Sequence, residues 1–272
     1  MPYIIQFMHP GGQPPYHRHH SSLPWNHFTN PHYRKFIRNK ILFLEENSDK
    51  PREEELFFWG EWEPPSTFTL TSLSNPYPVA FNDLPTQIRY PGGNLHNTDP
   101  YVFDGQFFYT NCQQIRKGSP TRLQKLPPGS MILFGSKIDG QFVLDTLFIV
   151  QDSFAYQADN LASVLPKQYY TDRFDHAVMR PLANTAHNKR LRFYVGSTYN
   201  KPFLVGDNAI FSFVPCSHRY FQRPVIDSPY INQKLSQGFK STNLSDQEIL
   251  NEWHEIVKQV YENKLCLGVA VL

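Results

Sequence analysis

The sequence predicts an α+β protein with a mixed, mainly antiparallel sheet or a small β-barrel, and with helices at its periphery. Three observations predict this class. Aromatic residues make up 15% of the chain, and they favour strands and stacking surfaces. The 23 prolines divide the chain into short segments. A clear helical period occurs only near the C-terminus, so most regular structure should be strand.

The length of 272 residues suits one large domain. We expect a single domain over 1–272, with a barrel-like core at about 55–150. Strands and an amphipathic helix should follow over 190–272.

In the first part of the chain, short apolar segments alternate with turn-forming residues. Tyr3–Met8 reads as a strand that ends at His9-Pro10-Gly11-Gly12, and residues 13–32 read as a loop. Residues 33–44 mix basic and apolar side chains and are expected to start as a short helix. Residues 45–55 should form a polar turn. A strand is expected at 56–63, with 68–73 pairing beside it and mostly loop over 74–105.

The later segments have sharper signals. A short strand is expected at 106–110, and strands at 130–135 and 141–150 flank residues 136–140 as a β-hairpin. A helical turn is expected at 159–165, and further strands at 191–195 and 209–214. Ser245-x-x-Glu248 has the pattern of a capping box, and Ile249, Trp253, Ile256 and Val260 follow at helical spacing. Residues 265–272 should form a final strand.

Net charge, cysteine content and hydropathy argue against several classes of protein. The net charge of +2 does not by itself indicate a nucleic-acid-binding protein. Cys112, Cys216 and Cys266 are isolated, which argues against a disulfide framework and a cysteine-based zinc site. No apolar run reaches the roughly 18 residues of a membrane span, and Tyr3–Met8 is too short for a signal peptide. We therefore expect a cytoplasmic protein without membrane contact. Phosphate-loop and dinucleotide motifs are absent, and no cofactor or metal is expected.

The first candidate constellation is Trp59-Gly60-Glu61-Trp62-Glu63. In a continuous strand, Trp59, Glu61 and Glu63 would share one face. A carboxylate between indoles is poorly solvated, so its pKa should rise, and Glu61 could serve as a general acid or base. The tryptophans would stack on a base. The alternative is a strand that simply packs its tryptophans into the core.

The second constellation is His96-Asn97-Thr98-Asp99-Pro100. As a catalytic group, Asp99 would orient water or stabilise an oxocarbenium ion, and Asn97 would bond a base edge. These side chains also cap turns, so an ordinary turn is the alternative. With the catalytic interpretation, we expect Asp99→Asn to abolish activity and Glu61→Gln to weaken substrate binding.

The remaining candidate site residues are histidines, one further carboxylate and several basic residues. His9 precedes two glycines, whose backbone could approach a phosphate or base, whereas His17, His19 and His20 read as a solvated loop. Asp145 is a minor substrate-binding candidate. Basic residues beside aromatic ones predict contacts to a nucleic-acid backbone, and the candidates are Arg34, Lys35, Arg38, Arg116, Lys117 and Arg190. A solvated charged face is the alternative for them.

Two resemblances add to this interpretation. The segment LPPGSMILFGSKIDGQFVLDTLFIV, within 106–150, resembles small β-barrels of the PUA, ASCH and EVE kind, which implies binding of RNA or of flipped modified bases. The chain also resembles a bacterial family associated with nucleotide modification and phage defence. The matching pieces are HPGG (9–12), FFWGEWEPPS (57–66), HNTDPYVF (96–103), ILFGS (132–136) and LDTLFIV (144–150). This resemblance implies action on modified DNA, as in anti-phage glycosylases that remove sugar-decorated cytosine.

The combined hypothesis is a protein that recognises a modified, flipped-out base in phage DNA and excises it as an N-glycosylase. One alternative is a reader of modified bases without enzymatic activity. Another is a metal-dependent defence nuclease, whose strand scission would stop with a chelator.

Overall fold

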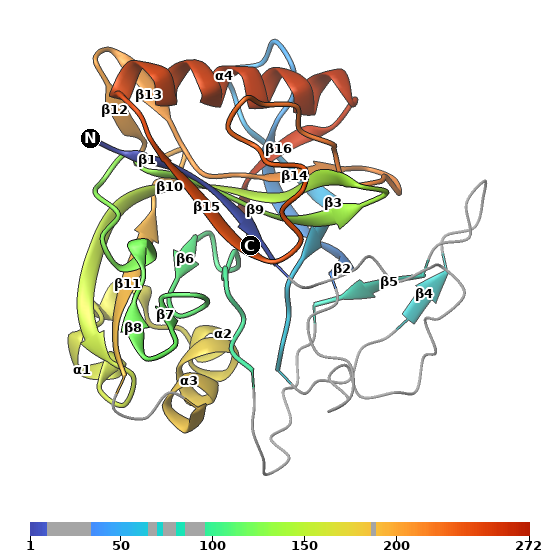
Figure 1. The fold of residues 1–272 in the computed structure, drawn as a ribbon. Coiled ribbons are helices and arrows are strands. Elements are labelled where there is room, and N and C mark those ends of the chain that lie inside the picture. Colours follow the sequence, from blue (N-terminus) through green and yellow to red (C-terminus); the bar gives the residue numbers. More distant parts are fainter. Residues whose placement is uncertain (10–33, 65–69, 73–79, 85–95, 186–188) are drawn as a thin grey trace.

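The computed structural model describes residues 1–9, 34–64, 70–72, 80–84, 96–185 and 189–272, and contains two six-stranded sheets (Figure 1). The strands of the first sheet are, in spatial order, β15 (Gly238–Asn243), β1 (Tyr3–Met8), β9 (Met131–Ile138), β10 (Gln141–Gln157), β11 (Arg190–Gly196) and β6 (Phe108–Tyr109). Only β1 and β9 are parallel neighbours in this sheet.

The second sheet contains a closed barrel. Its order is β16 (Cys266–Val271), β14 (Val214–Ser217), β3 (Arg52–Gly60), β2 (Lys35–Leu44), β5 (Ala80–Asp83) and β4 (Leu70–Ser72). Because β16 pairs with β2 as well as with β14, strands β16, β14, β3 and β2 form a closed ring of four. The expected α+β class with mainly antiparallel strands and a small barrel is therefore confirmed.

Helices and short hairpins lie around the sheets. Figure 1 shows α1 (Leu161–Val164), α2 (Asp172–Phe174) and α3 (Arg180–Thr185) grouped at one end, and α4 (Asp246–Glu262) across the opposite end. The remaining elements are the hairpins β7 (Ile115–Arg116) with β8 (Ser119–Pro120) and β12 (Phe203–Val205) with β13 (Asn208–Ile210), the 3₁₀ helices η2 (Arg122–Gln124) and η3 (Lys167–Tyr169), and the π-helical turn η4 (Asp175–Met179).

Helix α4 follows the sequence pattern closely. The capping box of Ser245 and Glu248 forms at its start, where both side chains satisfy backbone N–H groups. Ile249, Trp253, Ile256 and Val260 lie on its buried face. Strand β1, the hairpin of β9 and β10, the turn at α1 and strands β6, β11 and β16 are likewise confirmed.

Several expectations for strands and helices are wrong. Residues 35–44 form strand β2 rather than starting as a helix, because β3 and β16 pair with both edges of this segment. Strand β3 begins earlier than expected, at Arg52, and ends at Gly60 rather than Glu63. Strand β4 pairs with β5 instead of β3, whose second edge is occupied by β14. The segment 209–214 is divided between β13 and β14.

The barrel also lies elsewhere than 55–150. Two of its strands, β14 and β16, come from the C-terminal part, whereas the hairpin of β9 and β10 belongs to the first sheet. The two sheets nevertheless share one apolar core. It contains Ile37 and Phe58 from the barrel together with Phe134 and Phe193 from the first sheet. This shared core fixes the position of the barrel relative to β9 and β10.

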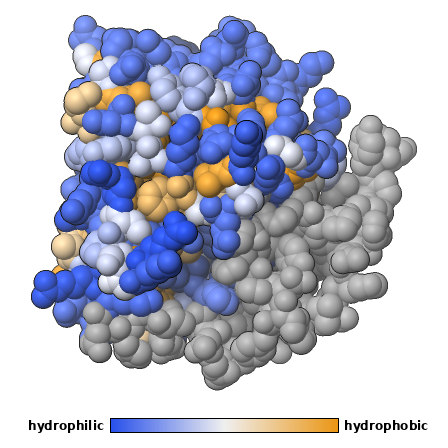
Figure 2. Space-filling model, in the orientation of Figure 1, coloured by the Kyte–Doolittle hydropathy of each residue, from blue (hydrophilic) through white to orange (hydrophobic). Residues whose placement is uncertain are grey.

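The surface is mostly hydrophilic on the face drawn in Figure 2, where hydrophobic residues are interrupted by polar ones. Among the described residues, no helix is both long and apolar enough to cross a membrane.

A candidate active site at a buried ion cluster

Five charged or ionisable side chains from distant parts of the chain meet inside the protein. We call this group the buried ion cluster: His9, Arg34, Glu61, Asp145 and Arg223. Arg34 lies at its centre, with Nε 2.6 Å from Asp145 Oδ2 and Nη1 2.5 Å from Glu61 Oε2. Arg34 and Glu61 are only 1% and 2% exposed, so their charges depend on one another rather than on water.

A β-bulge directs Asp145 into this cluster. The pairing of β10 with β9 shifts register between Leu144 and Thr146, which leaves Asp145 as the extra residue. Gly135 on β9 allows this, since a Cβ there would lie 2.1 Å from the backbone oxygen of Val143. Asp145 then accepts hydrogen bonds from two arginines, because Arg223 Nη1 lies 2.7 Å from its Oδ1.

Arg223 reaches the cluster from a segment that pairs with the same part of β10. The backbone N–H of Leu144 donates to the carbonyl of Pro224 over 2.9 Å. Arg223 also donates to Ser136 Oγ, and its guanidinium lies 5.7 Å from the centre of the Trp59 ring. Burial lowers the pKa of Arg223, although Asp145 acts in the opposite direction.

His9 and Glu61 form the other side of the cluster. His9 follows β1, and its backbone N–H donates to the carbonyl of Gly135. Its Nε2 lies 3.2 Å from Glu61 Oε2, the oxygen that also accepts from Arg34. The second oxygen of Glu61 accepts the backbone N–H of Asp99 at 3.2 Å. Glu61 therefore joins an imidazole, a guanidinium and the segment that carries Asp99.

Nη2 of Arg34 is buried and makes no hydrogen bond to any residue that the structure describes. Burial lowers the pKa of Arg34, but the adjacent Asp145 and Glu61 raise it more, so the net pKa lies above its ordinary value and the group keeps its charge. A charged donor without an acceptor is costly inside a protein, and an acceptor atom of a ligand would satisfy it.

Asp99 is fully buried and holds a loop. Its Oδ1 accepts the N–H of Thr110 at 2.9 Å, and its Oδ2 accepts those of Asn111 and Cys112 at 2.8 and 2.7 Å. Burial raises the pKa of Asp99 to about 6, against the effect of these backbone N–H groups. Asn97 contributes to the same loop, since its side chain bonds Thr110 Oγ1 and the Asn111 amide.

Lys35 and Glu63 form a second buried pair beside the cluster. Lys35 Nζ donates to the carbonyl of Trp62 and lies 4.0 Å from Glu63 Oε1. Burial lowers the pKa of Lys35 to about 8, although Glu63 and Glu61 raise it. A lysine with such a pKa holds a substantial neutral fraction slightly above neutral pH.

The two tryptophans do not frame the carboxylates as expected. Because β3 ends at Gly60, the strand alternation does not continue to Glu63. Trp59 packs against Phe36 and Phe57, and its Nε1 donates to the carbonyl of Phe221. Trp62 is fully buried in the main core, with its ring 5.2 Å from that of Phe103. Neither indole presents an open face in the structure.

The basic candidates fall into two sets. Arg34 and Lys35 are buried among carboxylates, so they do not form the exposed basic surface that was expected of them. Arg38 is partly exposed and bonds Asp83. Arg116, Lys117 and Arg190 are exposed. Hydrogen bonds from Gln114 to Arg192 and from Gln124 to Arg190 join the β7–β8 region to β11, which brings these three residues onto neighbouring elements.

The sequence contains no signal for some members of the site. Arg223 stands alone in an irregular segment, and only its pairing beside β10 brings it to Asp145. Ser136 lies in the segment expected as a hairpin turn, so the sequence does not indicate its bond to Arg223. The histidine-rich segment and Gly11-Gly12 lie outside the described residues. Within the described ranges, no group of three or more His, Cys, Asp or Glu side chains has the arrangement of a metal site.

Comparisons with known proteins found no match: no family model, no curated protein and no solved structure is similar to this chain.

Proposed function

We propose that the protein excises a modified base from DNA and that the buried ion cluster is its active site. One observation carries this proposal: His9, Arg34, Glu61, Asp145 and Arg223 converge from separate segments, while Nη2 of Arg34 has no acceptor among the described residues. Burying so many charges contributes little to stability, because desolvation offsets their attraction. Perturbed pKa values at Asp99 and Lys35 beside it are typical of functional sites.

The reaction needs three roles, and the cluster can supply each of them. Glu61 takes a proton from water, whose oxygen attacks the sugar carbon C1′. The bond between C1′ and the base nitrogen breaks, and its electron pair leaves with the base. His9 supplies the proton that neutralises the departing base, and Arg34 Nη2 bonds an acceptor on it. His9 Nε2 and Arg34 Nη1 both contact Glu61 Oε2, at 3.2 and 2.5 Å, so the three groups lie together at one site.

This assignment differs from the expectation that Asp99 is the catalytic carboxylate. The side chain of Asp99 accepts three backbone N–H groups of one loop, so we assign it to positioning the loop at 110–112. Glu61 instead bonds the side chains of Arg34 and His9 within the cluster.

Lys35 offers a second chemical route at the same site. Its neutral amine could attack C1′ in place of water and form an imine with the opened sugar, which leads to strand cleavage. Borohydride reduction traps such an imine as a covalent complex between protein and DNA. A Lys35-dependent complex would assign this route, and base loss without any complex would assign the route through water.

DNA as the partner is supported by the exposed Arg116, Lys117 and Arg190 on neighbouring elements. Such side chains neutralise phosphates, and their contribution falls with salt. Double-stranded DNA would have to extrude the base before it could enter a buried site.

The test is to incubate the protein with sugar-modified phage DNA and with unmodified DNA, and to run denaturing gels with and without alkali. Abasic sites break only with alkali, so base loss is distinguished from nicking. We expect base loss from modified DNA, and a decrease of at least about 100-fold in Glu61→Gln. Glu53→Gln, which changes an exposed carboxylate on β3, the strand that precedes Glu61, serves as the control. If neither DNA loses a base, the proposed excision is wrong.

A second candidate function, reading a modified base without chemistry, is favoured by the fully bonded state of Asp99 and the burial of Asn97. A reader would bind modified DNA tightly, with the same affinity for the wild type and Glu61→Gln, and would release no product. Fluorescence anisotropy on the DNA used in the gel assay separates the two functions.

A further inference from the structure

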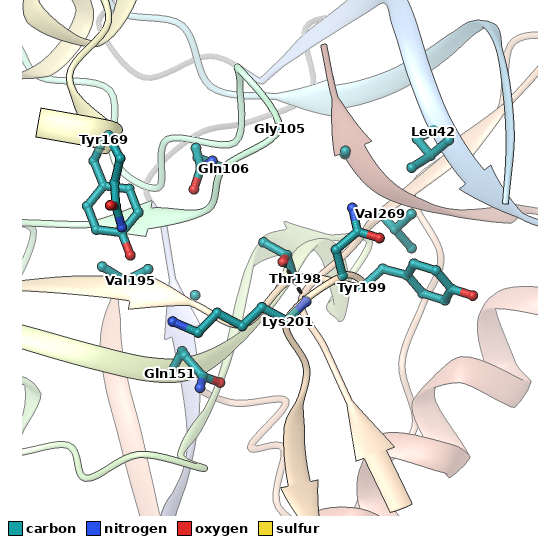
Figure 3. Close-up of a pocket in the computed structure, with 14 residues that line it drawn as sticks. Leu42, Gly105, Gln106, Gln151, Tyr169, Val195, Thr198, Tyr199, Lys201 and Val269 are labelled. Carbon is teal, nitrogen blue, oxygen red and sulfur yellow. Dashed lines mark hydrogen bonds between the residues drawn. The ribbon is translucent and has the colours of Figure 1, made fainter. Parts of the chain in front are cut away.

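A pocket of about 330 Å³ lies where the barrel meets the first sheet, apart from the buried ion cluster (Figure 3). Leu42 of β2 and Val269 of β16 line it from the barrel, and Gln151 of β10 and Val195 of β11 line it from the first sheet. Asp145 and Gln151 are six residues apart on β10, which corresponds to roughly 20 Å along a strand. The volume is at the lower end for small-molecule pockets and suits a ligand about the size of one nucleotide.

Two β-bulges shape this pocket. The pairing of β10 with β11 shifts between Val150 and Asp152, which leaves Gln151 as the extra residue. The pairing of β16 with β2 shifts between Gly268 and Ala270, which leaves Val269 as the extra residue. Bulges redirect side chains and are frequent next to binding sites. Both redirected side chains line the same cavity.

Gln151 presents an unsatisfied polar atom at this cavity. Its Oε1 is buried and makes no hydrogen bond to the residues that the structure describes. A carboxamide carries one acceptor and two donors, so either orientation of the amide leaves an unmet group here. A ligand with an N–H donor beside an acceptor would complete it. The exocyclic amine and adjacent ring nitrogen of adenine or cytosine have this pattern.

The remaining lining favours an anionic ligand with polar edges. Lys201 lies at the exposed rim, held in a turn in which its N–H donates to Thr198 Oγ1. Figure 3 shows the Lys201 side chain extending toward the side of Gln151, whereas Tyr199 turns its hydroxyl away, toward the carbonyl of Asp49. Tyr169 adds an aromatic wall. No Asp or Glu occurs among the described lining residues, which favours a phosphate-bearing ligand over a neutral sugar.

We propose that this pocket binds a single nucleotide whose base has an exocyclic amine, with the base edge on Gln151 and the phosphate on Lys201. Tyr169 contacts the base, and the apolar floor of Leu42 and Val269 excludes water from it. The nucleotide is either a free mononucleotide or one unit of a single strand, because both present this chemistry. This inference is independent of the proposed base excision, since the pocket shares no residue with the buried ion cluster.

The experiment is isothermal titration calorimetry of the full chain with dCMP, dAMP, dTMP, deoxycytidine, ribose 5-phosphate and a short cytosine- and adenine-containing single strand. We expect dCMP or dAMP to bind at least about tenfold more tightly than dTMP, which lacks the exocyclic amine. We expect Lys201→Ala to weaken dCMP or dAMP binding about fivefold or more and to leave deoxycytidine binding unchanged. Gln151→Leu, which keeps the size of the side chain, should abolish the preference between bases.

Lys137→Ala, an exposed lysine outside the pocket, is the matched control, and melting curves verify that every variant is folded. Binding of mononucleotides alone identifies a free nucleotide as the ligand, and tighter binding of the oligonucleotide identifies a strand. No binding at millimolar concentration, equal binding of ribose 5-phosphate, or equal losses in Lys137→Ala and Lys201→Ala would overturn the proposal. Because calorimetry does not measure excision, failure of the proposed function would leave these results unchanged.

Discussion

At the scale of single residues, Asp145 is the carboxylate that pairs with both arginines of the buried ion cluster. It is 3% exposed and accepts hydrogen bonds from two arginines that are themselves buried. Removing its charge takes away one ion-pair partner from Arg34 and one from Arg223. An uncompensated buried charge is far more damaging than the loss of a surface pair.

We therefore expect Asp145→Asn to lower the free energy of unfolding by about 3–5 kcal/mol. Glu53→Gln, which removes an exposed pair with Lys40, should change it by less than about 1 kcal/mol. Chemical denaturation of both variants measures the difference. A small loss in Asp145→Asn, similar to that in Glu53→Gln, would mean that water or a ligand already compensates the two arginines.

Asp99 gives a prediction about pH. Burial raises its pKa from the ordinary 3.8 to about 6, so the folded state holds the proton more tightly than the unfolded chain does. This contribution to stability is fully present below pH 3.8 and is lost as pH rises through about 6. The stability advantage of the wild type over Asp99→Asn should thus decrease by about 2 kcal/mol between about pH 4 and about pH 7.

Denaturation of the wild type and Asp99→Asn at several pH values tests this, because titration of all other groups is common to both proteins. A constant difference across the range would show that the three backbone N–H groups offset burial completely. A difference that increases with pH would show that they outweigh it.

At the scale of elements, the two β-bulges in β10 determine which side chains of the first sheet reach the buried ion cluster and the pocket. A regular strand would alternate its side chains between two faces, and Asp145 would not reach both arginines. Gly135 is the residue on β9 that makes the first bulge possible, because the backbone oxygen of Val143 occupies the position of a Cβ. The same glycine accepts the backbone N–H of His9, so one position supports two members of the buried ion cluster.

Gly135→Ala should accordingly cost at least about 3 kcal/mol, since a backbone atom cannot move aside as a flexible side chain can. Gly140→Ala is the matched control, because that glycine is in the turn of the same hairpin and has open space around it. Its positive φ of 83° should cost about 1–2 kcal/mol. Denaturation of both variants provides the comparison, and equal losses would contradict the steric argument.

The sequence predicts the elements that neighbouring residues determine. It does not predict the elements whose conformation depends on pairing with distant strands. The capping box at Ser245, the hairpin turn expected within 136–140 and the apolar Tyr3–Met8 all predict their elements, although β9 extends to Ile138 and shortens the turn. Residues 35–44 form a strand and not the expected helical start, and the basic side chains in this segment obscure an alternation in which Ile37, Ile41 and Phe43 face the core. The bulges have no local signature at all.

At the scale of the whole molecule, the site and the barrel are both products of distant segments. Sequence patterns identified His9, Glu61 and Asp145, which do come together, but assigned Arg34 to the surface. Arg223 could not be identified, because nothing near it in sequence distinguishes it from a surface arginine. The expected location of the barrel failed for the same reason, since its ring is completed by strands about two hundred residues from its first strand.

The last strand should therefore be essential to the whole fold. Strand β16 pairs with β14 on one side and β2 on the other, and Leu267, Val269 and Val271 are buried. Deleting 265–272 opens the ring, exposes two strand edges and removes apolar surface beneath α4, so we expect loss of cooperative unfolding and aggregation through the open edges. Deleting Leu272 alone, which bonds Lys40 and Asn39 at the margin, should leave the melting temperature nearly unchanged. A synthetic 265–272 peptide supplied to the shortened chain should restore solubility, because it can occupy the vacant position by strand addition. A shortened protein that melts cooperatively near the wild-type temperature would show that three strands hold the barrel without the fourth.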